Sequence, residues 1–206
     1  MSDPDTIATY EAVADEYRER HGDRSNVAEI VEAFLDALDD ATGTPADDPT
    51  DCGRVLDVGC GPGWESATFA GAGFDVLGID LTTEFLHAAA TETAPDADFA
   101  RMDMQRLGLA EDVFDGLWAC ASFLHVPREN APATLAGFER VLTDGGMLAL
   151  SVKRGEGIRE GDGYENDERE FVLYQPDELR ELVEDAGFEI EALEASDGWI
   201  FLLGRC

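Results

Sequence analysis

Two spacings of hydrophobic residues alternate along most of the chain. Short apolar runs of strand length are followed by segments in which apolar residues recur every three or four positions, as on one face of a helix. The expected strands lie at 54–58, 74–80, 97–102, 114–121 and 147–152, and the expected helices at 65–72, 83–92, 131–142 and 176–186. Strands and helices that alternate at this interval predict a doubly wound α/β fold, a parallel sheet with helices on both faces.

Both ends of the chain depart from this alternation. Two strand-like runs, 188–196 and 198–206, are joined by Asp197-Gly198, a dipeptide typical of hairpin turns, so we expect an antiparallel hairpin at the edge of the sheet. At the other end, helical patterns at 7–20 and 27–38 precede a polar linker, 39–51.

The length of the chain favours one domain. With 206 residues, 44% of them hydrophobic, the chain can bury a full core but is too short for a second large domain. We expect one domain over residues 1–206, with helices and linker in 1–50 and a Rossmann-like core in 51–206.

The charge balance is strongly acidic. There are 46 aspartates and glutamates against 14 lysines and arginines, and Lys153 is the only lysine. A net charge of -32 would repel nucleic acid and anionic membranes, and no basic cluster exceeds Lys153-Arg154, so we expect neither as a partner. The composition resembles that of proteins from salt-accumulating halophiles, and self-repulsion is expected to loosen the fold in dilute buffer.

The cysteines indicate no metal site and no disulfide framework. Cys52, Cys60, Cys120 and Cys206 form no CxxC pair and have no histidine at metal-ligand spacing. The chain shows no basic-then-apolar leader and no apolar run near the ~20 residues of a membrane span. We therefore expect a cytoplasmic protein, and the sequence does not indicate its oligomeric state.

The segment "VLDVGCGPGWE", residues 55–65, ends the first expected strand in a turn with three glycines. In a doubly wound sheet the ligand binds at this turn. Without Cβ atoms, Gly59, Gly61 and Gly63 permit positive φ and a close ligand, although a turn that merely needs glycine is the alternative. A dinucleotide site would have a glycine where Trp64 stands.

Two acids in the same segment favour a cationic ligand over a diphosphate. Glu65 begins the following helix, where it would compete with a phosphate for the positive end of the helix dipole. Asp57 precedes the glycines by two positions. A ligand carrying an ammonium or a sulfonium suits both acids.

The stretch "VLDVGCGPG" resembles the first motif of the class I S-adenosylmethionine-dependent methyltransferases, in particular their small-molecule branch. The resemblance extends from about Tyr10 to the C-terminus and implies a Rossmann-like sheet of seven strands with S-adenosylmethionine as cofactor. It implies that Asp57 helps to hold the methionine amino group. The turn would contact the methionyl and ribose portions through Gly59, Cys60, Gly61 and Gly63.

Two later elements complete the expected cofactor site. Asp80, followed by Leu81, ends the second strand about twenty residues after the glycines, where its carboxylate could accept from the ribose hydroxyls. Capping of the helix that begins near Thr82 is the alternative for Asp80. By resemblance, Asp103 and the backbone of Met104 would hold the adenine.

The end of the fourth strand, from Cys120 to His125, is expected to form the floor between cofactor and acceptor. Cys120 belongs to the cofactor side of this floor. His125 could act as a general base near neutral pH or position the acceptor. Its segment, "LHVP", could equally be a packing and turn element.

The acceptor side is expected to come from the N-terminal helices and the long loop 153–173. Tyr10 and Tyr17 are seven residues apart and share a helical face, where they either close over the cofactor or pack on the sheet. The loop region carries cations followed by aromatic residues that could bind an anionic or aromatic acceptor, or could form surface ion pairs. These residues are Lys153, Arg154, Arg159, Arg169, Phe171 and Tyr174.

Methyl transfer to a small-molecule acceptor is the leading hypothesis. The alternatives are a non-catalytic S-adenosylmethionine-binding protein and an NAD-dependent oxidoreductase. The sequence leaves open which atom of the acceptor would be methylated.

Overall fold

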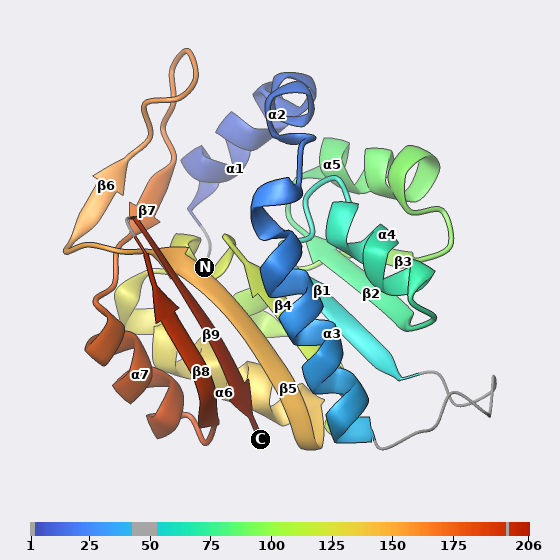
Figure 1. Ribbon diagram of the computed structural model, residues 1–206. Coiled ribbons are helices and arrows are strands. Elements are labelled where there is room, and N and C mark those ends of the chain that lie inside the picture. Colours follow the sequence, from blue (N-terminus) through green and yellow to red (C-terminus); the bar gives the residue numbers. More distant parts are fainter. Residues whose placement is uncertain (1–2, 43–52, 197) are drawn as a thin grey trace.

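A seven-stranded sheet forms the centre of the computed structural model, which describes residues 3–42, 53–196 and 198–206 (Figure 1). The strand order is β3-β2-β1-β4-β5-β9-β8. All neighbouring pairs are parallel except those of β9, which is antiparallel to β5 and β8. The seven strands are β1 (Arg54–Val58), β2 (Asp75–Asp80), β3 (Asp98–Arg101), β4 (Phe114–Cys120), β5 (Leu142–Lys153), β8 (Glu189–Ala195) and β9 (Trp199–Arg205). The doubly wound α/β fold with a C-terminal antiparallel hairpin is confirmed.

Helices cover both faces of the sheet (Figure 1). Helices α3 and α4 pack on one face, and α6 and α7 pack on the other. The helices are α1 (Pro4–Ala12), α2 (Ala14–His21), α3 (Ala28–Thr42), α4 (Trp64–Gly71), α5 (Thr83–Ala88), α6 (Ala131–Val141) and α7 (Pro176–Asp185). The helix expected at 83–92 ends as a π-helical segment over Ala89–Thr93.

The alternation of side chains along each strand separates two hydrophobic cores. Trp118 of β4 lies against Phe34 of α3 and Phe69 of α4, with ring centroids 5.3 and 5.5 Å away. Its neighbour Leu117 faces the opposite core, together with Phe138 of α6. All these side chains are buried, and truncating Phe34 or Phe138 to alanine should cost about 3–5 kcal/mol.

Glycine at position 116 permits the close approach of α3. A Cβ atom there would lie 2.7 Å from Leu38 and 2.8 Å from Phe34, nearer than side-chain atoms can pack. Helix α3 is therefore held tightly against β4 and β5.

The N-terminal segment forms two helices where the sequence predicted one. The predicted helix 7–20 is broken at Val13, whose φ of -110° and ψ of 12° are not helical. Helix α1 begins earlier than expected because Pro4 follows Asp3, whose carboxylate accepts from the Thr6 amide at 2.9 Å. The predicted linker 39–51 falls mostly outside the described residues.

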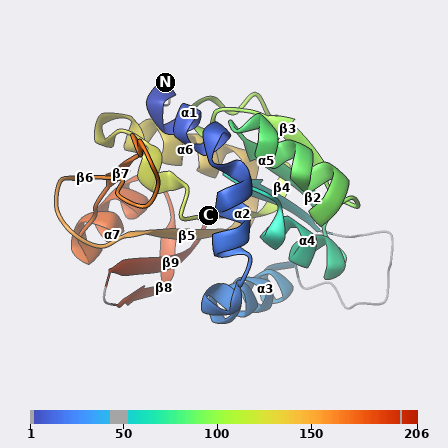
Figure 2. The same cartoon turned by 90° about the horizontal axis from the view of Figure 1, so that it is seen from above.

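The long loop after β5 contains a small hairpin that the sequence did not predict. Strands β6 (Ile158–Glu160) and β7 (Glu170–Val172) pair in antiparallel fashion. The hydroxyls of Thr6 and Thr9 in α1 accept from the amides of Glu170 and Glu168, at 3.2 and 3.3 Å. Figure 2 shows α1 between this hairpin and α5, so the N-terminal helix bridges two sides of the molecule.

Candidate active site

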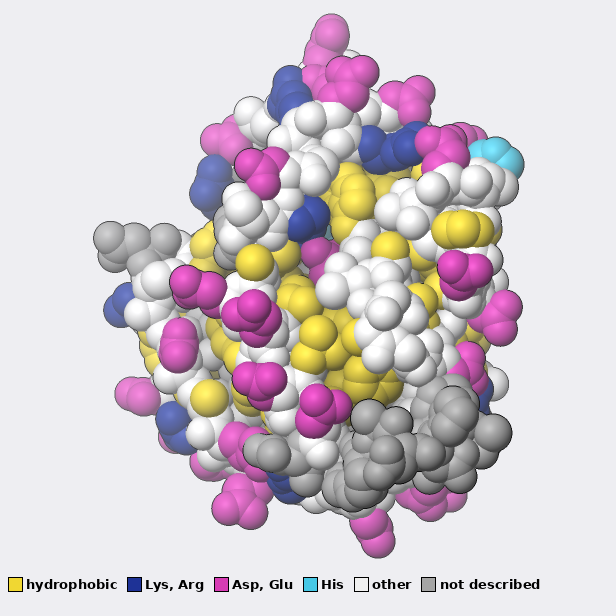
Figure 3. Space-filling model, turned by 45° about the vertical axis from the view of Figure 1, so that its right-hand side comes forward, with side chains coloured by type: hydrophobic (Ala, Val, Ile, Leu, Met, Phe, Trp, Pro, Cys, Tyr) yellow, Lys and Arg dark blue, Asp and Glu magenta, His cyan; other side chains and the backbone are white. Residues whose placement is uncertain are grey.

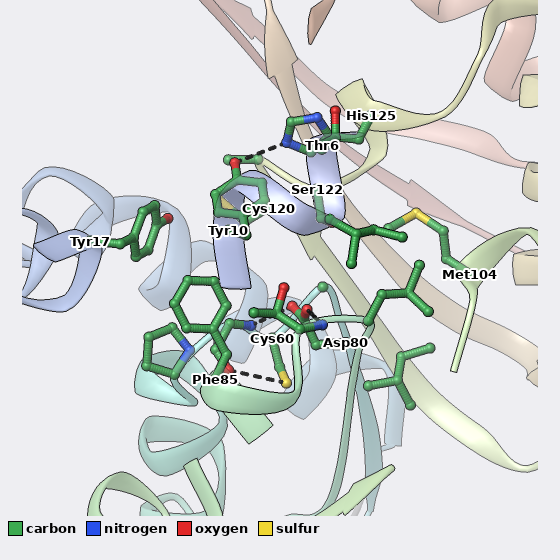
Figure 4. Close-up of a pocket in the computed structure, with 18 of the residues that line it drawn as sticks. Thr6, Tyr10, Tyr17, Cys60, Asp80, Phe85, Met104, Cys120, Ser122 and His125 are labelled. Carbon is green, nitrogen blue, oxygen red and sulfur yellow. Dashed lines mark hydrogen bonds between the residues drawn. The ribbon is translucent and has the colours of Figure 1, made fainter. Parts of the chain in front are cut away.

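A cleft opens where the carboxyl ends of β1, β2 and β4 meet beneath α1 and α2 (Figure 4). The order of the strands reverses at β1, which lies between β2 and β4, and ligands of doubly wound sheets bind at this position. Seven of the expected cofactor residues line the cleft: Gly59, Cys60, Gly61, Asp80, Leu81, Met104 and Cys120.

The three glycines of the turn have different structural roles. Gly59 adopts a φ of 69° and a Cβ there would lie 2.3 Å from Cβ of Ser122, so glycine is required where the turn crosses the end of β4. Gly61 has a φ of 52° and no heavy atom within 4 Å of its Cβ position. Its backbone therefore faces open space and can be approached by a ligand. Gly63 instead packs α4 against Ala89, at 2.9 Å from its Cβ position, and does not line the cleft.

Asp80 is fixed by the turn that it supports. Its Oδ2 accepts from the Gly61 amide at 3.0 Å, and its Oδ1 accepts from the Thr82 amide at 2.7 Å. Burial raises the pKa of Asp80, while the hydrogen bonds from Thr82 and Gly61 favour its charged form. Asp80 is among the residues that line the cleft.

Asp80 accepts from the amide of Thr82, the N-cap residue of α5, whereas the first two amides of that helix are held by another residue. The amides of Thr83 and Glu84 at the start of α5 donate to the carboxylate of Glu11 in α1, at 2.7 and 3.2 Å. Sequence reasoning missed this contact because Glu11 is 72 residues from Thr83.

Asp57 lies beneath the glycine turn and does not line the cleft. It is 2% exposed, and its Oδ2 accepts from the Ser66 hydroxyl at 2.5 Å. Burial and the nearby Glu65 carboxylate raise the pKa of Asp57 to about 8. The side chain is therefore predominantly protonated at neutral pH, and a cation in the cleft would favour its ionisation.

Glu65 is paired with an arginine that sequence reasoning did not single out. Its Oε1 accepts from Nε and Nη2 of Arg24, at 2.7 and 2.6 Å, and both residues line the cleft. The acid at the start of α4 is thus compensated by Arg24, which follows α2 in the chain.

Of the two residues expected to bind the adenine, one lines the cleft and the other does not. Met104 lines the cleft. Asp103 is the N-cap of a short 3₁₀ helix, Met104–Arg106, and accepts from the Gln105 amide at 2.9 Å. Asp103 is not among the residues that line the cleft, so its contact with adenine stays a prediction.

The end of β4 forms the boundary of the cleft. The Ser122 hydroxyl donates to the Val58 carbonyl at 2.6 Å, and Ala121 has a positive φ of 54°, a strained conformation for a residue with a Cβ atom. Burial raises the pKa of Cys120 to about 12, and its Sγ lies 3.1 Å from the Ser151 hydroxyl. Cys120 is therefore a neutral lining residue with no reactive thiolate.

His125 and Tyr10 close the upper side of the cleft (Figure 4). Nδ1 of His125 lies 2.8 Å from the Glu170 carbonyl, which can only accept, so Nδ1 carries the proton. Nε2 must then accept from the Tyr10 hydroxyl, 3.0 Å away. Burial lowers the pKa of His125 to about 4 and raises that of Tyr10 to about 12, so both groups are neutral at pH 7.

A second cavity adjoins the cleft on the side of the β6–β7 hairpin. The two share Tyr10, Tyr17, Arg24, Cys120 and Ala121. The open space is about 140 Å³ in the cleft and about 430 Å³ in the second cavity. Tyr10, Tyr17 and Phe85 narrow the cleft. The two tyrosines, which were expected either to close over the cofactor or to pack on the sheet, thus line both spaces.

Two residues expected to bind the acceptor lie elsewhere. The Tyr174 ring is buried, with its centroid 6.1 Å from that of the Phe123 ring, which is tilted by 31° to it, and 4.9 Å from the Arg128 guanidinium. Arg154 directs Nη1 towards the Ser196 carbonyl at 3.5 Å. Neither lines the cleft or the second cavity, whereas Arg159, Arg169 and Phe171 of the same loop do line the second cavity.

The part of the chain that the structure describes contains neither a metal-binding cluster nor a membrane-spanning helix. Within these residues no group of three or more histidine, cysteine, aspartate or glutamate side chains is arranged to hold a metal ion. Among the described helices, none has both the length and the apolar character needed to span a membrane.

Comparison with known proteins shows which family the central part of the chain resembles. Residues 55–146 match the family described as "Methyltransferase domain". The methyltransferase GfsG of Streptomyces halstedii is 34% identical over 105 residues, which cover 48% of this chain and 37% of the relative. The chain thus spans less than half the length of the curated relatives it matches.

Solved structures share the fold over nearly the whole chain. The 1,6-didemethyltoxoflavin-N1-methyltransferase of Burkholderia thailandensis has a TM-score of 0.75 at 20% identity, covering 98% of this chain and 87% of that one. The [4+2]-cyclase SpnF has a TM-score of 0.72 at 20% identity, covering 99% and 97%. Residues 55–146 are therefore similar in sequence to methyltransferases, and the chain shares its fold with these solved structures.

Proposed function

We propose that this protein transfers the methyl group of S-adenosylmethionine to a small-molecule acceptor. The observation that carries the proposal is the junction of the two cavities at Tyr10, Cys120 and Ala121. One cavity holds the Asp80 carboxylate and the exposed backbone of Gly61, and the other offers about 430 Å³ for a second molecule. That volume is within the range of small-molecule pockets.

The described residues fit the cofactor. Asp80 would accept from the ribose hydroxyls, and the backbone of Gly59 and Gly61 would lie against the methionyl and ribose portions. The protonated, buried Asp57 would compensate the methionine ammonium from beneath the turn by losing its proton. Met104 would contact the adenine from the end of β3.

The chemistry needs little from the protein besides orientation. S-Adenosylmethionine supplies a methyl group already activated by its sulfonium. Tyr10, Cys120 and Ala121, which border both cavities, would hold the nucleophilic atom of the acceptor in line with that methyl. A general base is required only if the nucleophile arrives protonated. The Tyr10–His125 pair offers a hydroxyl and a neutral imidazole at this border.

The alternatives are separated by binding and turnover. The likeness to a [4+2]-cyclase indicates that the fold supports reactions besides methyl transfer. An NAD-dependent oxidoreductase is disfavoured, since Trp64 occupies the third glycine position and the acid at the helix start is retained in the cleft.

The test is twofold. Calorimetry should show S-adenosylhomocysteine binding more tightly than NAD, and methyl-labelled S-adenosylmethionine should transfer label to a member of a panel of small acceptors. An Asp80→Ala variant serves as the matched control for both. Tighter binding of NAD would contradict the cofactor assignment. Binding of S-adenosylmethionine without label transfer to any acceptor would favour the non-catalytic alternative.

A further inference from the structure

The second cavity concentrates positive charge in a strongly acidic protein. Of the 14 lysines and arginines, five line this cavity, whereas Asp162 is the single acid among the described residues that line it. The five are Arg20, Arg24, Lys153, Arg159 and Arg169. Figure 3 shows acidic side chains spread over the visible face, with several basic ones gathered at its upper part.

Four of these cations already have carboxylate partners. The arginines are paired as Arg20–Glu16, Arg24–Glu65, Arg159–Asp162 and Arg169–Asp167. The Arg169–Asp167 pair is bidentate, at 2.7 and 2.6 Å, and both side chains are at least nine-tenths buried. These guanidinium groups therefore shape the cavity wall, and their charge is largely compensated.

Lys153 differs from the four arginines. Its ammonium makes no ion pair with any described residue. Instead Nζ lies 4.4 Å from the ring centroid of Trp199 and 5.2 Å from that of Phe171. Burial, followed by the charges of Arg159 and Arg169, lowers the pKa of Lys153.

The backbone holds Lys153 in a defined place. It is the last residue of β5 and pairs with Trp199 of β9 in the antiparallel ladder, so the two side chains are cross-strand neighbours. Phe171 continues from Lys153 to His125, with ring centroids of Phe171 and His125 5.1 Å apart. Aromatic side chains thus connect the ammonium with the border between the two cavities.

Resting on the proposed methyl transfer, we propose that the acceptor is an anionic small molecule whose charged group pairs with Lys153 and whose apolar or aromatic framework lies between Phe171, Trp199 and Tyr10. A carboxylate or a phosphate would provide an anionic partner for Lys153, as the carboxylates do for the four arginines. Lys153 is half-buried, so such a charge-assisted contact is stronger there than at a fully exposed position.

The single lysine makes a direct test possible. Protein labelled with ¹³C at lysine Cε gives one side-chain signal, which reports on Lys153 alone. In protein saturated with S-adenosylhomocysteine, benzoate and phenyl phosphate should shift this signal and raise the pKa of the ammonium. Neutral benzamide should leave that pKa unchanged. The groups that face Lys153 are Arg159, Arg169, Asp162 and His125, and they are the same in every sample.

Variants provide a second measurement. Lys153→Met should weaken benzoate binding about tenfold or more, the effect of losing a charge-assisted bond, with S-adenosylhomocysteine affinity unchanged. Lys153→Arg should retain most of the affinity. Arg180→Met removes one charge from the surface of α7, paired there with Glu184, and should have no effect.

A lysine signal and pKa that respond to neither anion, in protein that binds S-adenosylhomocysteine, would overturn the anionic acceptor. Equal loss of benzoate binding in Lys153→Met and Arg180→Met would overturn it as well. Failure to bind S-adenosylhomocysteine would instead overturn the proposed function. The relative affinities of the protein for benzoate and phenyl phosphate distinguish a carboxylate acceptor from a phosphate acceptor.

Discussion

The Tyr10 hydroxyl donates a hydrogen bond to Nε2 of His125 across a distance of 3.0 Å. The direction of this bond is fixed because Nδ1 of the same ring donates to the Glu170 carbonyl at 2.8 Å. One chain of hydrogen bonds therefore links three segments that are distant in the sequence: α1, the end of β4 and β7. A histidine with both nitrogens engaged is suited to holding Tyr10 in place.

This arrangement predicts a flat pH profile for the methyl-transfer step. Because burial lowers the pKa of His125 to about 4, its ring stays neutral throughout the range from about pH 5.5 to about pH 8. The rate at saturating cofactor should show no inflection from His125 in that range. His125→Gln should reduce the rate without changing the shape of the profile. An inflection between these limits that disappears in His125→Gln would assign a general base to His125.

The raised pKa of Asp57 predicts that cofactor binding releases a proton. With its pKa raised to about 8, the free protein holds a proton at neutral pH that a nearby ammonium would expel. Affinity for S-adenosylmethionine should therefore rise as the pH increases towards about 8. Calorimetry in buffers of different ionisation enthalpy should detect proton release at pH 7, and none in Asp57→Asn. Adenosine, which lacks the ammonium, is the matched control ligand and should release no proton.

The same carboxyl predicts how the stability of the free protein depends on pH. A raised pKa means that the folded chain binds more protons than the unfolded chain between about pH 4 and about pH 8, so the free energy of unfolding falls as pH rises through this window. Asp80, also raised, has the same sign. His125 has the opposite sign below its unfolded pKa of about 6.5, so the measurement belongs above that value. Chemical denaturation should show a negative slope there that is reduced in Asp57→Asn.

Asp80→Ala should weaken binding of S-adenosylhomocysteine about 10- to 150-fold. Charge-assisted hydrogen bonds to the ribose are worth about 1.5 to 3 kcal/mol, and each 1.4 kcal/mol is a decade of affinity. Asp103→Ala should cost less, since it lies outside the lining of the cleft. Thermal unfolding of both variants controls for loosening of the turn, since Asp80 also accepts from the amides of Gly61 and Thr82. Normal affinity in Asp80→Ala would contradict the ribose contact.

Salt should stabilise the protein. At a net charge of -32, carboxylates repel one another over the whole surface in dilute buffer, whereas ~1 M salt reduces the Debye length to about 3 Å. The melting temperature should therefore rise between dilute buffer and molar KCl. Sucrose at matched osmolality separates charge screening from exclusion effects. A melting temperature that does not rise with KCl would remove the halophilic interpretation.

Periodic patterns predicted the sheet well because they depend on local sequence. A strand that is buried on both faces and followed by an amphipathic helix is visible in any short window, as residues 54–58 and Trp64–Gly71 illustrate. The break at Val13 was not predicted, since the apolar spacing continues through it.

The sequence predicted those parts of the candidate site whose residues all belong to one short motif. Gly59, Gly61 and Asp80 lie within about twenty residues and line the cleft. The Arg24–Glu65 pair joins residues 41 positions apart, and no local pattern indicates it. Tyr174 was expected at the acceptor because it follows the loop cations, but an aromatic residue near a cavity can equally belong to the core, as Tyr174 does.

The position of α1 has a consequence for the order of folding. Thr6 and Thr9 hold amides that are 164 and 159 residues further along the chain, and Glu11 holds two that are 72 and 73 residues away. During synthesis α1 therefore gains its partners in the hairpin only after Glu168 and Glu170 have been made. Contacts of such long sequence separation form late and slowly. Helix α1 precedes these partners in the chain. A nascent chain interrupted before Glu168 would therefore have the glycine turn but would lack the hydrogen bonds that tie α1 to the hairpin beside the two cavities.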